Sequence, residues 1–110
     1  MHVTRAGSAP AYQAVAHHGV EAFRLHGRDV TPLKEFWVGL SDFAPGGGAE
    51  KGSSPTAKVY IVVEGAITVV TANETIELGP LDSCLIEADE ERIVENRGGA
   101  HARMLVVSPS

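Results

Sequence analysis

Short runs of β-branched and aromatic residues, separated by turn residues, constrain the fold of this chain more than any other feature. The chain contains 13 Val, 5 Ile and 6 Thr against 7 Leu and 2 Met, and β-branched side chains favour extended backbone. No helical period lasts longer than a turn or two. A chain of 110 residues has the size of one domain with one hydrophobic core. The sequence therefore predicts a single-domain, all-β protein, built as an antiparallel sandwich or small barrel.

Turn residues set the boundaries of the expected strands. The strands are predicted at residues 20–25, 35–43, 58–64, 66–71, 75–78, 83–87, 92–96 and 101–107. Residues 46–55 contain four Gly, two Ser and one Pro, which is typical of a flexible surface loop. Gly65 is expected to close an antiparallel hairpin between 58–64 and 66–71. Residues 1–18 are predicted to be a flexible or loosely attached N-terminal segment, and residues 19–110 the barrel domain.

Charge and hydropathy narrow the classes of partner. Fourteen acidic against nine basic residues give a net charge of -5 and a pI of about 5.4, which argues against general attraction to nucleic acid or to an anionic membrane. No apolar run is long enough for a membrane span or a secretory signal, so a cytoplasmic location is expected.

Cys84 is the single cysteine, and its apolar surroundings in the sequence favour a buried, inert thiol. A homodimer is expected, because small sheets have edge strands that need cover.

The order of turns and strands from Pro45 to Asn96 resembles the cupin family of small β-barrels. The family's first motif is G-x5-H-x-H, three or four residues, then E-x6-G, and its second is G-x5-P-x-G-x2-H-x3-N. On this chain the first motif begins at Gly46 and ends at Gly65, and the second keeps Asn96 at its end and the Asp that commonly follows its first glycine, here Asp82. The resemblance covers about residues 20–107 and implies a cupin barrel, which is a jelly-roll or double-stranded β-helix.

The resemblance also shows where this chain departs from metal-binding cupins. None of the four expected metal ligands is present, since the histidines and the glutamate are replaced by Gly52, Ser54, Lys58 and Arg92. The second motif also has Leu81, Glu87 and Asp89 in place of its first Gly, its Pro and its second Gly. We therefore expect no metal site and no cofactor. The five histidines lack the spacing of a ligand set.

Family geometry would place Lys58 and Arg92 in the same cavity. At ~6 Å and an effective dielectric constant of ~20, two such cations repel by roughly 3 kcal/mol, and a bound anion would offset this repulsion. Arg suits a carboxylate or phosphate because of its planar fork, and Lys supplies a point charge. The alternative is that both side chains reach the rim and pair with acidic residues there. These are Glu87, Glu90, Glu91 and Glu95.

Five other residues are candidates for the site. Strand alternation places Tyr60 on the side of Lys58, where it binds a ligand or a backbone carbonyl. Trp37 is a candidate for substrate binding, although core or interface packing explains it as well. Ser54 is a candidate donor to an anion, or an ordinary loop residue. His101 is a candidate general acid or base at the barrel mouth, with Arg103 on the same face, or an ordinary strand-end histidine.

The sequence therefore predicts a metal-independent protein that binds a small anionic metabolite, a carboxylate. The predicted catalytic residues are Lys58, Tyr60 and His101, and the predicted substrate-binding residues are Ser54, Arg92, Arg103 and Trp37. Isomerase, lyase or cyclase-type chemistry would follow if the chain is an enzyme. The alternatives are a binding or sensing module without turnover, a structural dimer, and a metal-dependent dioxygenase with unrecognised ligands.

Overall fold

The computed structural model describes residues 1–110 and contains nine strands and one short 3-10 helix. The helix is η1 (Ala6–Ser8), and the strands are β1 (Ala11–Tyr12), β2 (His17–His26), β3 (Phe36–Gly52), β4 (Lys58–Glu64), β5 (Ile67–Val70), β6 (Thr75–Leu78), β7 (Ser83–Ile86), β8 (Arg92–Glu95) and β9 (Ala102–Pro109). No helix has the length and apolar character that crossing a membrane requires.

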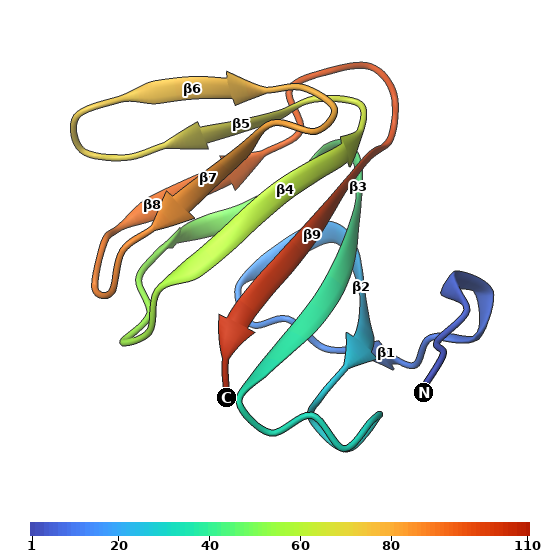
Figure 1. Cartoon of the computed structure of the whole chain (residues 1–110). Helices are drawn as coiled ribbons and strands as arrows, with labels where there is room; N and C mark the ends of the chain where they lie inside the picture. Colours follow the sequence, from blue (N-terminus) through green and yellow to red (C-terminus); the bar gives the residue numbers. More distant parts are fainter.

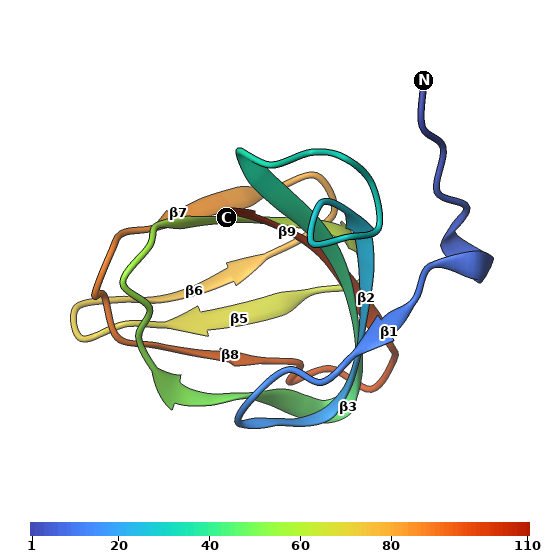
Figure 2. The ribbon, with the colours of Figure 1, turned by 90° about the horizontal axis from the view of Figure 1, so that it is seen from below.

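The nine strands form one antiparallel sheet that curls into a nearly closed barrel. Its order is β6-β5-β8-β3-β9-β4-β7, with β2 paired to β3 and β1 paired to β2. Figures 1 and 2 show the strands wrapped around a common axis, with the N-terminal stretch running away from the barrel. The prediction of an all-β antiparallel barrel of the jelly-roll type is confirmed.

Alternation along the strands separates an apolar interior from the outer surface. In β9 the residues Ala102, Met104 and Val106 are buried, and their odd-numbered neighbours are partly or fully exposed. Phe43, Val62 and Ile67 are each no more than 1% exposed. The core lies where these inward faces meet, and it leaves open one end of the barrel, where the cavity described below begins.

The glycine-rich stretch is part of a strand and not the predicted flexible loop. Strand β3 continues through it, pairing with β9 in its first half and with β8 at Gly48, Ala49 and Gly52. Neighbouring backbone passes so close that a Cβ at Gly48 would overlap the carbonyl oxygen of Val94. The prediction for residues 46–55 was therefore wrong for 46–52, because these glycines permit close strand approach and a bend in β3.

The predicted hairpin around Gly65 is also wrong. Strand β4 pairs with β7 and β9, whereas β5 pairs with β6 and β8, so the chain changes sides of the barrel at this point. Gly65 has a φ of +74°, and a Cβ there would lie 2.8 Å from the carbonyl oxygen of His101. A glycine is required at this position because the chain passes close to the start of β9, and not because two paired strands turn here.

Part of the predicted N-terminal segment belongs to the sheet. Tyr12 of β1 pairs with Ala22, and β2 begins at His17. Further out, the Thr4 hydroxyl donates a hydrogen bond of 2.7 Å to the carbonyl oxygen of Leu25. Residues 11–18 therefore contribute backbone and side chains to one end of the barrel.

Candidate functional site

One end of the barrel contains a cavity of about 370 Å³. Its walls come from β1, β2, β3, β4, β8 and β9, from the segment between β1 and β2, and from the loop after β3. Five of the seven predicted site residues line it, namely Trp37, Ser54, Lys58, Tyr60 and Arg92. Residues from the first quarter of the chain complete the wall, including Tyr12, His17 and Arg24.

Lys58 and Tyr60 enter the cavity from the same strand. They lie two residues apart at the start of β4, so strand alternation turns both toward the interior. Lys58 is half-buried, and this burial lowers the pKa of its ammonium. The positive charges of Arg92, Arg28 and Arg24 lower the Lys58 pKa further. The site therefore raises the fraction of Lys58 that is neutral and able to accept a proton.

Arg92 of β8 reaches across the cavity to Tyr60. Its Nε donates a hydrogen bond of 3.1 Å to the Tyr60 hydroxyl, and its Nη1 donates one of 3.0 Å to the carbonyl oxygen of Gly52. Burial raises the pKa of Tyr60, and the adjacent Arg92 opposes part of this rise. Tyr60 is therefore a neutral phenol at physiological pH. Because its oxygen accepts from Arg92, its own proton is free for another acceptor.

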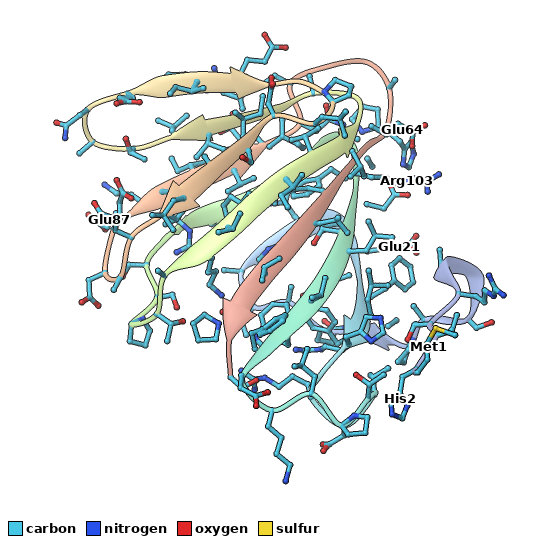
Figure 3. The ribbon with its side chains drawn as sticks, viewed as in Figure 1. Met1, His2, Glu21, Glu64, Glu87 and Arg103 are labelled. Atoms are coloured by element: carbon cyan, nitrogen blue, oxygen red, sulfur yellow. The ribbon has the colours of Figure 1, made fainter.

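The alternative in which acidic residues at the rim pair with Lys58 and Arg92 is absent from the structure. No carboxylate oxygen lies within 4.0 Å of either side chain's nitrogens. Glu95 instead pairs with Arg97 at 2.6 Å, and Figure 3 shows Glu87 directed away from the barrel. The two cations thus share the cavity without an anionic protein partner.

An aromatic cluster forms another part of the wall. The Arg24 guanidinium carbon lies 3.9 Å from the centre of the Tyr12 ring and 4.7 Å from that of Trp37. The Lys58 ammonium lies 5.5 Å from the Trp37 ring, within the range of a cation–π contact. Trp37 is 6% exposed, and its buried Nε1 donates to no protein atom. Burial also raises the pKa of Tyr12.

His101 and Arg103 lie outside this cavity. The His101 Nδ1 is 2.7 Å from a carboxylate oxygen of Asp42, and the Arg103 Nε is 2.9 Å from one of Glu64. Figure 3 shows Arg103 and Glu64 together on the outer surface. The reason is strand alternation, since β9 turns Met104 and Val106 inward and Arg103 outward.

The residues at the family's metal positions do not suit a divalent cation. The first motif's glycines keep left-handed backbone, with φ of +79° at Gly46 and +74° at Gly65. Leu81 and Asp89, which replace glycines of the second motif, also have positive φ of 72° and 63°. This agreement supports the motif alignment, and the aligned ligand positions then hold a glycine, a serine and two cations. No group of three His, Cys, Asp or Glu side chains is placed to hold a metal ion.

Arg24 and Tyr12 line the cavity but were not among the site residues predicted from the sequence. Arg24 lies on the predicted strand 20–25, two residues after the buried Ala22, so alternation alone could have turned it inward. Tyr12 lay in the segment predicted to be loosely attached, and no local signal indicates its pairing with β2. Its position depends on a contact between distant parts of the chain.

Fold and cavity together define a small jelly-roll barrel with a cationic pocket. The lining contains three strong cations, Arg24, Lys58 and Arg92, and no Asp or Glu, although the whole chain has a net charge of -5. The family model described as Cupin_2, cupin domain, matches residues 39–108. The chain therefore belongs to this cupin family, as its motifs indicated.

Similar proteins include several with named activities. The chain is 42% identical over 106 residues to Beta-D-galactosidase Rv1717 of Mycobacterium tuberculosis (strain ATCC 25618 / H37Rv), covering 96% of this chain and 91% of that protein. The polyketide cyclase RemF from Streptomyces resistomycificus matches with a TM-score of 0.88 and 19% identity over 99% of this chain and 79% of that one. A cupin-superfamily sugar phosphate isomerase from Silicibacter pomeroyi matches with a TM-score of 0.74 and 26% identity, over 84% of this chain and 60% of that one.

Proposed function

We propose that this chain binds a small anionic metabolite, a carboxylate, in the barrel cavity without the help of a metal ion. The observation that carries the proposal is the pair Lys58 and Arg92, which share the cavity with no carboxylate within 4.0 Å. Burying such cations without a partner is unfavourable. A ligand carboxylate offsets this cost and accepts the hydrogen bonds that the protein leaves unused.

The hydrogen-bonding capacity of the site fits this ligand class. Arg92 uses two of its five N–H groups on Tyr60 and Gly52, so three remain for an anion. Lys58 provides three further donors, and Tyr60 provides its free hydroxyl proton. The cavity volume of about 370 Å³ lies near the lower end of the range for small-molecule sites, roughly 300–1,000 Å³.

Proton-transfer chemistry is the catalytic form of this proposal. With a keto acid bound, Arg92 holds the carboxylate and neutral Lys58 takes a proton from the carbon beside the carbonyl group. The C–H electron pair moves to form the enolate, whose oxygen accepts a hydrogen bond from Tyr60. Return of the proton from Lys58 to a different atom completes an isomerisation. His101 and Arg103 take no part, because neither residue lines the cavity.

Galactoside hydrolysis is a second candidate, favoured by the 42% identity to a protein named a β-D-galactosidase. Most glycoside hydrolases use two carboxyl groups, about 5–5.5 Å apart in retaining enzymes and about 6.5–9.5 Å apart in inverting ones. The cavity lining contains no Asp or Glu. Hydrolysis here would need another acid and another nucleophile or base, so we rank this activity second.

Thermal unfolding with a ligand panel tests the primary proposal. The panel contains small carboxylates, neutral sugars and divalent metal ions, each at low and high salt, and uses the wild-type chain and the Lys58→Ala/Arg92→Ala variant. A carboxylate at about 100 times its Kd adds about 2.7 kcal/mol to the stability of the wild type, and this gain should vanish in the variant. Stabilisation that is equal in both proteins would show that the anion binds elsewhere.

Turnover is tested in parallel with a chromogenic β-galactoside and with keto acids in deuterated water. Exchange of a carbon-bound proton that depends on Lys58 would support the isomerase form. Binding without exchange would favour a sensing module. Galactoside cleavage that survives in the Lys58→Ala/Arg92→Ala variant would separate hydrolysis from this cavity.

Homodimer formation and a cytoplasmic location stay predictions.

A further inference from the structure

The positive charge of the cavity extends beyond the pair Lys58 and Arg92. Arg24 also lines the wall, and Arg28 lies 5.9 Å from the Trp37 ring. No carboxylate oxygen approaches any of these four side chains within 4.0 Å. Lys58 lies 5.5 Å from the centre of the Trp37 ring, the same ring on which Arg24 stacks, and it lines the cavity together with Arg92.

Arg24 is held in place without polar contacts to the protein. Its guanidinium stacks on Tyr12 and Trp37 at 3.9 Å and 4.7 Å, and its side chain makes no hydrogen bond or ion pair. Aromatic faces attract the cation but leave its N–H groups free. The Trp37 Nε1 is a further buried donor without a partner. This end of the cavity therefore holds the free N–H groups of Arg24 and supplies no acidic acceptor.

A single negative charge cannot balance this wall. A monocarboxylate that binds Arg92 and Lys58 leaves Arg24 uncompensated in the same partly desolvated cavity, where charges interact more strongly than in water. A ligand with two negative charges neutralises more of the cluster and provides more acceptor oxygens. Phosphate monoesters carry about 1.5 to 2 negative charges near pH 7, with a second pKa of about 6.

We propose that the cavity selects small metabolites carrying two negative charges, with Lys58 and Arg92 as the anchor and Arg24 as the residue that requires the second charge. A phosphate monoester and a dicarboxylate share this chemistry. The inference rests on the proposed function and deepens it, since that function requires one negative charge only.

Calorimetric titration with two esters of matched shape and different charge tests the inference. Galactose 6-phosphate and galactose 6-sulfate have nearly the same shape, but the sulfate ester carries one negative charge at all relevant pH values. At about pH 7.5 the phosphate ester is a dianion, and we expect its Kd to be at least tenfold lower than that of the sulfate ester. At about pH 5, below the second phosphate pKa of about 6, the two Kd values should become equal within about twofold.

The ratio of the two Kd values isolates the ligand's charge from titration of the protein. The groups that face the ligand are Lys58, Arg92 and Arg24, the phenols of Tyr12 and Tyr60, and His17. A change in the charge of any of these groups between the two pH values acts on both esters, so it cancels in the ratio to first order.

Two variants and a second ligand pair complete the test. Arg24→Gln should reduce the phosphate preference to less than threefold, whereas Arg97→Gln, which removes an arginine outside this cavity, should leave it unchanged. Succinate should bind at least tenfold more tightly than its monoamide, succinamate, if dicarboxylates are accepted. The unfolding temperature of each variant without ligand verifies that it is folded.

The outcomes separate this inference from the proposed function. Equal, saturable and Lys58-dependent binding of mono- and dianions would overturn the requirement for two charges and leave the anion-binding function intact. A phosphate preference that persists in Arg24→Gln would overturn the assignment of Arg24. If none of these anions binds, both proposals fail.

Discussion

Replacing Lys58 with methionine should stabilise the ligand-free protein. Burial and three neighbouring arginines lower the pKa of Lys58, which means that the folded state disfavours its charge. Methionine keeps a similar length, removes the charge and retains contact with the Trp37 ring through its sulfur. The same variant should lose affinity for anions, so stability and binding should change in opposite directions.

The size of the effect follows from the geometry around Trp37. Lys58 and Arg24 lie 5.5 Å and 4.7 Å from the centre of this ring, so their charges are separated by no more than about 10 Å. At that distance the repulsion is about 0.4 kcal/mol for the dielectric constant of water and about 1.7 kcal/mol for an effective value of ~20. Losing the cation–π contact offsets about 0.5–1 kcal/mol, whereas relief from desolvation and from the other arginines adds to the gain.

We therefore expect Lys58→Met to gain about 0.5–1.5 kcal/mol, after a discount for its half-exposed position. For a domain of this size the gain corresponds to about 2–7 °C in Tm. Thermal unfolding at about 0.01 M and about 1 M salt, where the Debye length is ~30 and ~3 Å, should show the larger gain at low salt. Lys51→Met removes an exposed lysine of β3 and is the matched control.

The pH dependence gives a further check on the sign. The unfolded chain binds the Lys58 proton more tightly than the folded chain, so wild-type stability rises with pH between the lowered Lys58 pKa and the ordinary lysine value of 10.5. The advantage of Lys58→Met should shrink over this interval. A variant that is less stable than the wild type at low salt would refute the reasoning.

Three further predictions concern the barrel that supports the cavity. Asn96 is 2% exposed and makes three hydrogen bonds with backbone groups. Asn96→Ala should therefore lower the free energy of unfolding, measured in urea, by about 2–4 kcal/mol. A loss below about 1 kcal/mol would contradict this prediction. Gly48→Ala should destabilise by more than about 2 kcal/mol because its Cβ meets the Val94 carbonyl oxygen, whereas Gly99→Ala meets nothing within 4 Å and should differ little. Leu81 is 82% exposed with a φ of 72°, so Leu81→Gly should raise stability by about 0.5–1 kcal/mol, and an equal loss would show that φ is not the cause.

The sequence predicted features that depend on short-range patterns. The strand run 58–64 was correct to the residue, since continuous β-branched residues between turn signals have one good local solution. The spacing from Gly46 to Asn96 gave the family, and with it the placement of Lys58 and Arg92 in one cavity. Alternation placed Tyr60 beside Lys58.

Features that depend on contacts between distant segments were not predictable in this way. Gly47 and Gly48 have the composition of a loop, and only the close passage of neighbouring strands explains why they lie within β3. Gly65 has the signature of a hairpin, but the pairing of β4 with β9 directs the chain elsewhere. His101 was predicted at the barrel mouth because the sequence alone does not show which face of β9 points inward. The structure shows that Met104 is on the inward face and Arg103 on the outward face.

Trp37 provides the most direct test of an anion site in the cavity, because it is the single tryptophan of the chain, it lines the cavity and its Nε1 has no protein partner. Its indole N–H gives one isolated signal in a ¹H–¹⁵N spectrum. Titration with a stabilising carboxylate or phosphate ester should move this signal saturably in the wild type, with the same Kd as calorimetry, and should leave it unmoved in Lys58→Ala/Arg92→Ala. An anion that stabilises the wild type while the Trp37 signal stays in place would contradict the account.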